Sequence, residues 1–155
     1  MEDNRPDSLS TQIIRQATLS DAQQINKLST YLGYAQSTVS DTQQQLLALL
    51  ESDREAVYVA EQEERLIGWI HCFKALRLAS SSFYEIGGLV VCPTQRQQGI
   101  GRQLVEYAIS QHSGSWRVRC NSKRHQSHLF YQALGFSQSK SQHIFEIQSD
   151  KSRLI

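Results

Sequence analysis

The chain has 155 residues, of which 39% are hydrophobic and 20% charged, and this composition fits one ordinary domain with a single core. Sixteen Lys and Arg residues against fifteen Asp and Glu residues leave a net charge of +1, so no overall field favours nucleic acid or an anionic membrane. No apolar run is long enough to span a membrane, and the polar start of the chain is unlike a signal peptide. We therefore expect a cytoplasmic protein that binds neither nucleic acid nor membranes.

The three cysteines, Cys72, Cys92 and Cys120, are widely spaced and form no Cys-x-x-Cys pair. This spacing argues against a disulfide framework and against a structural zinc site. We expect no metal, and we interpret the cysteines as small buried hydrophobic residues.

Residues 1–10 are polar and unpatterned and predict a disordered lead-in, which leaves residues 11–155 as one domain. Within this domain, runs rich in β-branched and aromatic residues predict strands at 13–14, 56–60, 66–73, 83–91, 116–120 and 143–147. Apolar residues at helical spacing predict helices that end at Gly33, at about Glu51, near His112 and at Leu134. The resulting order, β-α-α-β-β-β-α-β-α-β, predicts an α/β fold (an α+β mixed sheet) with helices on the faces of the sheet.

Two capping-box spacings predict where the first two helices start. Thr18 or Ser20 stands before the first helical stripe, with an acidic or amide residue three positions later. Ser40 and Gln43 repeat this spacing before the second helix.

The segment from Leu89 to Leu104 runs from a predicted strand through a short loop into a predicted helix. Glycines at positions 99 and 101 let the backbone approach a ligand, and the N–H groups of the first helical turn then point at an anion. The pattern indicates a pyrophosphate cradle, to which Arg96 and Arg102 add charge-assisted contacts unless Arg96 braces the loop instead. A Gly-x-Gly turn by itself also occurs without a ligand, and neither a P-loop nor a Rossmann fingerprint is present.

Two linked motifs resemble those of a known family. The stretch 96–101, Arg-Gln-Gln-Gly-Ile-Gly, resembles the acetyl-CoA motif of the GNAT superfamily of N-acetyltransferases. The stretch 129–136, Leu-Phe-Tyr-Gln-Ala-Leu-Gly-Phe, resembles the Phe-Tyr-Glu-x-Leu-Gly-Phe signature of the same superfamily. The resemblance covers nearly the whole patterned chain and is closest to the branch of aminoglycoside-type and other small-amine acetyltransferases. It implies the GNAT fold, whose fourth and fifth strands splay apart, and acetyl-CoA as co-substrate.

The resemblance also assigns contacts with the cofactor. In this superfamily the pantetheine arm pairs with the backbone of the fourth strand, whose N–H groups can stabilise negative charge on the thioester oxygen. The residues implied in CoA binding are Leu89, Val90, Val91, Arg96, Gln97, Gln98, Gly99, Ile100, Gly101, Arg102, Asn121, Arg124 and Ser127. Arg124 departs from the Asn of many family members; with Arg119 and Lys123 it either meets the CoA phosphates or lies in solvent. Asn121 either bonds the pantetheine or caps the following loop.

Two residues are expected to move protons. The resemblance makes Tyr131 the general acid that protonates the leaving CoA thiolate, and the alternative is a tyrosine that only packs against the cofactor. It makes Glu85 the base for the acceptor amine, because the histone acetyltransferase branch has its catalytic Glu at this place; the alternative is a solvated surface residue. Simple strand alternation puts one set of residues on a common face: Glu85, Gly87, Leu89 and Val91.

Other residues are expected on the acceptor side. The resemblance places Tyr31 and Tyr34 between the first two helices, at the border of the acceptor pocket, unless they only pack the helix end. His71 is a further substrate-side candidate and a weaker alternative base, although most such histidines are structural. Gly87 and Gly88 predict either a β-bulge at the splay or close backbone packing.

The sequence therefore predicts an acetyl-CoA-dependent N-acetyltransferase that acetylates a primary amine, carried by a small molecule or a protein, by direct attack in a ternary complex. No covalent acetyl-enzyme is expected, because no His is spaced to activate Cys92 or Cys120. The alternative is a non-catalytic acyl-CoA-binding regulatory module. Exposed sheet edges near the C-terminus are compatible with a homodimer, a state common in the superfamily.

Overall fold

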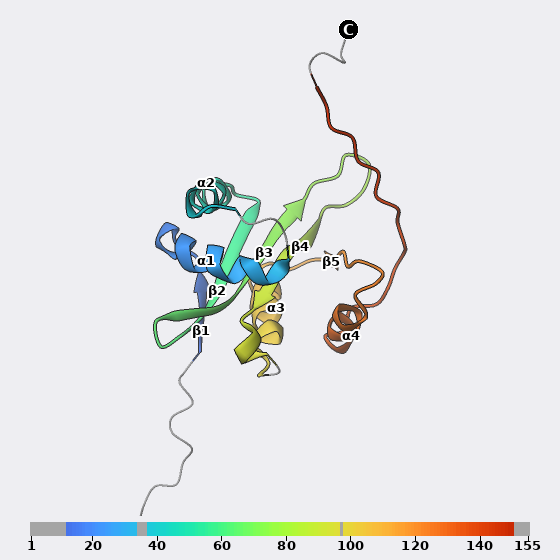
Figure 1. Ribbon diagram of the computed structural model, residues 1–155. Helices are drawn as coiled ribbons and strands as arrows, with labels where there is room; N and C mark the ends of the chain where they lie inside the picture. Colours follow the sequence, from blue (N-terminus) through green and yellow to red (C-terminus); the bar gives the residue numbers. More distant parts are fainter. Residues whose placement is uncertain (1–11, 34–36, 97, 151–155) are drawn as a thin grey trace, which may run out of the picture. The chain divides into compact units, whose positions relative to one another are not determined.

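The computed structural model describes residues 12–33, 37–96 and 98–150 (Figure 1). It divides into two compact units, Met1–Asn121 and Ser122–Ile155, which are described separately. The lead-in predicted at residues 1–10 lies outside the described residues. None of the helices in the described ranges has the length and apolar character that a membrane crossing requires.

A mixed five-stranded sheet organises the first unit, and its strands follow one another across the sheet in chain order. The strands are β1 Ile13–Gln16, β2 Glu55–Gln62, β3 Arg65–Ala75, β4 Phe83–Val91 and β5 Trp116–Val118. Neighbours from β1 to β4 are antiparallel, whereas β4 and β5 are parallel. This sheet with its helices confirms the predicted fold class.

The splay predicted between the fourth and fifth strands is visible in the pairing of β4. Only Tyr84–Ile86 of β4 pairs with β5. Within the described residues, the rest of β4, from Gly87 to Val91, has a strand partner on the β3 side alone. The backbone groups on the opposite edge are therefore available to another partner.

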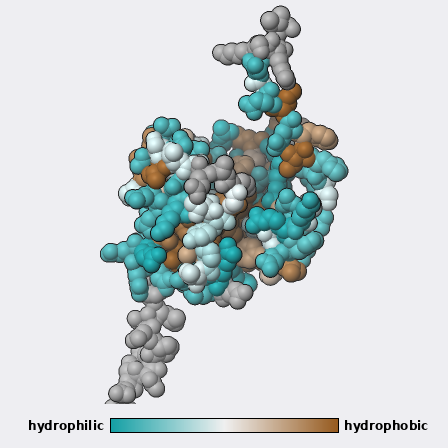
Figure 2. All heavy atoms as spheres, in the orientation of Figure 1, coloured by the Kyte–Doolittle hydropathy of each residue, from teal (hydrophilic) through white to brown (hydrophobic). Residues whose placement is uncertain are grey.

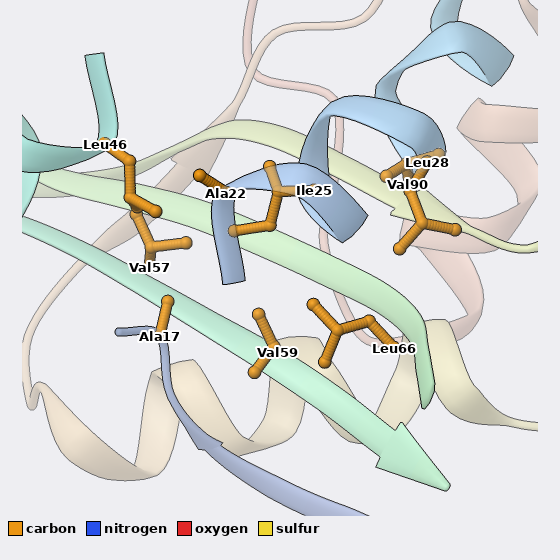
Figure 3. Packing of buried hydrophobic residues seen from close by; sticks show 9 residues of the cluster. All are labelled: Ala17, Ala22, Ile25, Leu28, Leu46, Val57, Val59, Leu66 and Val90. Atoms are coloured by element: carbon orange, nitrogen blue, oxygen red, sulfur yellow. The ribbon is translucent and has the colours of Figure 1, made fainter. Parts of the chain in front are cut away.

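Helices cover both faces of the sheet (Figure 1). On one face lie α1 (Ala22–Ser29), which follows a short 3-10 turn at Leu19–Asp21, and α2 (Val39–Leu50). On the other lies α3 (Ile100–Gln111), close enough that a Cβ on Gly68 of β3 would lie 3.1 Å from Leu104. The side chains of α1 point onto the sheet in Figure 3. They complete a buried cluster formed by Ala17, Ala22, Ile25, Leu28, Leu46, Val57, Val59, Leu66 and Val90.

The start of α2 differs from the prediction. The capping box consists of Thr38 and Asp41, not Ser40 and Gln43: Thr38 Oγ1 accepts from Asp41 N at 3.0 Å, and Asp41 Oδ2 accepts from Thr38 N at 3.2 Å. An ionised carboxylate accepts a backbone N–H more strongly than a neutral amide does, and it also favours the positive end of the helix dipole. Ser40 therefore lies inside the first turn.

The second unit holds one helix, α4 (His125–Ala133), and an extended segment after it. The helix ends at the C-cap Leu134, which agrees with the predicted end. Gly135 follows with a φ of +100°, and Phe136 N donates to Tyr131 O at 3.0 Å in a Schellman-type closure. The strand predicted at 143–147 does not form. Its apolar side chains are exposed, for example Phe145 at 92%, and brown spheres mark this segment in Figure 2. Alternation supplies only a propensity, and a strand also needs a paired edge.

Candidate functional site

A β-bulge at Gly87 reorganises the faces of β4. His71 of β3 pairs with Gly88, and the next residue, Cys72, pairs with Ile86, so Gly87 is an extra residue on β4. One extra residue reverses the alternation beyond it. Glu85 therefore lies opposite Phe73, on the face of α1 and α2, whereas Leu89 lies opposite Ile70, on the other face. The common face predicted for Glu85, Gly87, Leu89 and Val91 is wrong for this reason.

The two glycines at the bulge also make room for side chains of β3. A Cβ on Gly87 would lie 2.8 Å from His71 Nδ1 and 3.2 Å from a ring carbon of Phe73. A Cβ on Gly88 would lie 3.0 Å from the indole of Trp69. Both interpretations of the glycine pair therefore hold, since Gly87 forms the bulge and both residues allow close packing.

His71 is paired with a carboxylate from the neighbouring strand. Its Nε2 lies 2.6 Å from Glu55 Oε2, and the side chains of the pair are 24% and 26% exposed. A carboxylate only accepts hydrogen bonds when ionised, so Nε2 carries the hydrogen in this contact. In the neutral imidazole, Nδ1 then holds the lone pair, on the side of Gly87. No sequence motif singled out Glu55; its register beside His71 depends on the β2–β3 hairpin.

Glu85 lies in the same layer but has different partners. It is 9% exposed, so it is not the solvated surface residue of the alternative interpretation. Its Oε1 lies 2.7 Å from Arg117 Nη2 and 3.3 Å from Arg119 Nε. Arg119, expected near the CoA phosphates, is thus engaged by Glu85. The alternation of Trp116 to Arg119 was the signal in the sequence that these two arginines share one face.

A cavity of about 290 Å³ lies between α1, α2 and the sheet, within the first unit. His71 and Trp69 line it, together with residues of both helices, whereas Glu85 is not among its described lining residues. Thr30 and Leu32 also line it, but Tyr31 between them does not and is 47% exposed. Tyr34 lies outside the described residues. The cavity lies on the predicted acceptor side, beside the two helices.

A glycine turn precedes α3, so the predicted change from loop to helix is confirmed here. Gly99 is left-handed, with a φ of +79°, and nothing lies within 4 Å of the place of a Cβ, so conformation rather than space requires glycine here. Gln103 N donates to Gly99 O at 2.9 Å, which starts the helix. The N–H groups of the first turn lack helical acceptors and point out of the helix end. Arg96 and Gln98 are exposed beside this turn.

The other residues predicted to bind CoA are distributed over both units. Arg102 Nε lies 2.8 Å from Glu106 Oε1 in an exposed pair one turn apart. Gln97 lies outside the described residues, and Asn121 is an exposed residue at the end of the first unit. In the second unit, Arg124 precedes α4 as its N-cap residue, and Ser127 lies in the first turn of this helix.

Tyr131 lies in the second unit, on α4. Its ring makes edge-on contacts with Phe130, at a centroid distance of 4.9 Å, and with Phe136, at 5.5 Å. Both ring contacts are with residues of the second unit.

The face of the sheet beneath α3 carries inert groups. Burial raises the pKa of the Cys72 thiol to about 12, with a smaller contribution from the nearby Glu55 charge, so this cysteine stays protonated at neutral pH. Burial also raises the pKa of Tyr58 to about 12 and lowers that of His112, and the two side chains are hydrogen-bonded at 2.8 Å. Over the described ranges, no group of three or more His, Cys, Asp or Glu residues gathers as a metal site would require.

Solved structures show the same fold. A transcriptional regulator from Bacillus halodurans C-125 has 22% identity and a TM-score of 0.79, over 88% of this chain and 100% of its own. An aminoglycoside antibiotic 6'-N-acetyltransferase from Acinetobacter baumannii has 17% identity and a TM-score of 0.80, over 90% and 100%. An aminoglycoside N-acetyltransferase in complex with CoA has 19% identity and a TM-score of 0.78, over 90% and 97%.

Comparison with curated proteins gives no match. The family model described as an acetyltransferase (GNAT) domain matches residues 53–138, which is more than half of the chain and includes the bulge, the glycine turn and Tyr131. The chain belongs to the GNAT family of acetyltransferases.

Proposed function

We propose that this acetyltransferase moves the acetyl group of acetyl-CoA to a primary amine, by direct attack in a ternary complex. The observation that carries the proposal is the edge of β4 from Gly87 to Val91, which no strand of the described residues pairs on the β5 side. This strand leads to the glycine turn at Gly99. A strand edge offers the pantetheine amides hydrogen bonds, and a helix start offers the pyrophosphate N–H donors.

Acetyl-CoA is the proposed co-substrate. Pantetheine pairs with Leu89, Val90 and Val91, and the pyrophosphate meets Gly99 and the first turn of α3, which includes Ile100 and Gly101. Arg96 and Arg102 add positive charge beside that turn, with Gln97, Gln98, Asn121, Arg124 and Ser127 as further contacts. The CoA complex of the aminoglycoside N-acetyltransferase with this fold supports the assignment.

The reaction joins the amine nitrogen to the thioester carbon and breaks the carbon–sulfur bond. Tyr131 is the proposed acid that gives the CoA thiolate a proton, since a phenol suits that transfer. Tyr131→Phe, which keeps the ring contacts, is expected to lower kcat by about 100-fold with KM for acetyl-CoA retained. Unchanged turnover would leave Tyr131 a packing residue.

The base predicted at Glu85 stays a prediction. Its contacts with Arg117 and Arg119 support a second role, which is to hold β5 against β4 at the start of the splay. Glu85→Gln separates the two roles. A lower kcat at unchanged urea stability supports the base, whereas lower stability at similar kcat supports the structural role.

Acetyl-CoA titration by calorimetry and measurement of CoA release with a panel of primary amines test the function. Binding with acetyl transfer is expected. Absence of acetyl-CoA binding contradicts the proposal, and binding without transfer to any amine indicates a regulatory acyl-CoA module instead. We further propose that the acceptor amine belongs to a small molecule or to a protein. A cytoplasmic location and a homodimer are also proposed from the sequence.

A further inference from the structure

We infer that the cavity beneath α1 and α2 receives a small amine with an apolar body and a single amino group, and that His71, oriented by Glu55, accepts the proton of that amine. The inference rests on the proposed acetyl transfer and specifies its acceptor.

The walls of the cavity are uncharged. Among the described lining residues there is no Asp, Glu, Lys or Arg, and His71 is the one titratable group. Much of the lining is apolar: Ile25, Leu32, Leu46, Leu49, Val57 and Trp69. The volume of about 290 Å³ is at the small end of ligand pockets, which span roughly 300–1,000 Å³. A body of about one ring fits such a space.

Several polar side chains of the lining bond within the protein, whereas the buried Trp69 Nε1 has no hydrogen-bond partner among the described residues. Asn26 Nδ2 donates to Ser37 O at 2.8 Å and to Thr42 Oγ1 at 2.9 Å, which ties α1 to the start of α2. Ser29 Oγ donates to Ile25 O at 2.6 Å. In the same way, Thr30 Oγ1 donates to Lys27 O at 2.7 Å. The hydrogens of Asn26, Ser29 and Thr30 are thus engaged, and Trp69 Nε1 is the indole donor that a ligand can meet among the apolar side chains of the described lining.

This lining discriminates between classes of amine. A polycationic acceptor would bring several charges against walls that offer no carboxylate, and buried charges without partners are strongly unfavourable. A monoamine brings one charge, and one group that can take its proton, His71, lines the cavity. The acceptor class inferred here therefore differs from the aminoglycosides named for two proteins of the same fold.

The surroundings of His71 suit a base. Glu55 holds Nε2 from β2, and Phe73 lies beside the ring at a centroid distance of 5.8 Å. Nδ1 lies on the side of Gly87 of β4, where the absence of a Cβ lets the imidazole pack closely. The described lining from α1 and α2 is neutral, so Glu55 is the charged partner of His71 there. Glu85, one row further along the sheet, is engaged by Arg117.

The proton balance follows from this geometry. The ammonium of the acceptor gives one proton to His71 Nδ1, and the imidazolium is stabilised by the Glu55 carboxylate. The nitrogen lone pair then forms the carbon–nitrogen bond, the carbon–sulfur bond breaks, and the second nitrogen proton replaces the one that Tyr131 gives to the thiolate. The products are the amide, CoA with its thiol, and one proton that His71 releases to solvent.

Competing amines test the acceptor class. For the full chain, kcat/KM for 2-phenylethylamine is expected to exceed that for spermidine and for kanamycin by about tenfold or more. A tenfold change corresponds to about 1.4 kcal/mol, and burying one charge without a partner costs more than that. Equal or reversed preference overturns the class. Thermal stabilisation by 2-phenylethylamine without acetyl-CoA is a second measure, and its absence likewise counts against the cavity.

His71→Gln tests the base, with the exposed His143→Gln as the matched control. Loss of the acidic limb in the pH profile of kcat/KM, at unchanged acetyl-CoA affinity, is expected for His71→Gln alone. If His71→Gln transfers acetyl at the wild-type rate and keeps the acidic limb of the pH profile, His71 is not the base, while the proposed function stands. Failure of the wild-type chain to bind acetyl-CoA would instead be a failure of the proposed function.

Discussion

Two glutamates lie in one row across the sheet, Glu55 on β2 and Glu85 on β4, each opposite Phe73 of β3. Glu55 is paired with His71, whose neutral imidazole has a lone pair that accepts a proton, whereas Glu85 is paired with guanidinium groups, which have no such lone pair. The comparison shows that the partner, not the carboxylate, decides whether such a pair can exchange protons. The histidine pair suits chemistry, and the arginine cluster suits a fixed strand junction.

Crowding the histidine pair should have the largest effect. Gly87→Val places side-chain atoms where a Cβ alone is already 2.8 Å from His71 Nδ1, so the imidazole must move. We expect kcat/KM to fall by about 100-fold or more, with some loss of stability. Gly88→Ala is the milder comparison, because its Cβ meets only the ring edge of Trp69. If wild type and Gly87→Val have the same kcat/KM, His71 takes no part in the reaction.

Replacing Glu55, the carboxylate paired with His71, should lower the rate of the reaction more than the stability of the fold. In Glu55→Gln the amide can donate to His71 Nε2, which moves the imidazole hydrogen to Nδ1 and removes the lone pair beside Gly87. We expect kcat to fall by about 100-fold. Because the pair is partly exposed, the free energy of unfolding should change by less than about 1 kcal/mol. Steady-state kinetics and urea unfolding measure the two quantities, with exposed Asp53→Asn as control.

The arginine cluster should respond in the opposite way. Arg117→Met leaves the buried Glu85 carboxylate with Arg119 alone, so we expect the free energy of unfolding in urea to fall by about 2 kcal/mol. The double variant with Glu85→Gln should recover part of this loss, because the buried charge is gone. Arg102→Met breaks only an exposed pair and should cost less than about 0.5 kcal/mol. A similar loss in both single variants would mean that burial does not distinguish the clusters.

Asp21 is a further carboxylate that is paired with an arginine, Arg15, rather than with a histidine. Burial of Asp21 opposes its ionisation, but hydrogen bonds from Arg15 and Thr18 outweigh burial and hold the pKa of this carboxyl below its usual value. A depressed carboxyl pKa contributes stability that is present above about pH 4 and lost as the pH falls below it. Asp21→Asn should therefore cost about 1 kcal/mol at pH 7. That difference should shrink in urea unfolding at pH 2.5, and a constant difference would show that ionisation is not responsible.

Local chemistry was predictable because it depends on neighbours in the chain. The helix that starts after Gly99 and the helix that ends before Gly135 both follow from residues within one or two turns. The order of strands and helices was predictable for the same reason, since periodicity is local. The two GNAT-like motifs, at residues 96–101 and 129–136, are each continuous in the sequence, so they can be identified without the structure.

Contacts across strands were not predictable to the same degree. The extra residue at Gly87 is assigned by pairing with β3, and it reverses the face of Leu89 relative to Glu85. The partners of Glu85 and His71 come from β5 and β2, so no spacing along the chain contains them. The apolar residues near Phe145 had a strand pattern but no partner strand among the described residues.

By itself, the sequence determined the fold class, the glycine turn before α3 and the resemblance to acetyltransferases, because each is written in consecutive residues. Only the tertiary structure decided which carboxylate holds an arginine and which holds a histidine, and that the acceptor-side cavity is uncharged among its described residues. The physical reason is that charge pairing and cavity lining depend on side chains from separate strands and helices. Their register is set by sheet pairing and by one bulge rather than by distance along the chain.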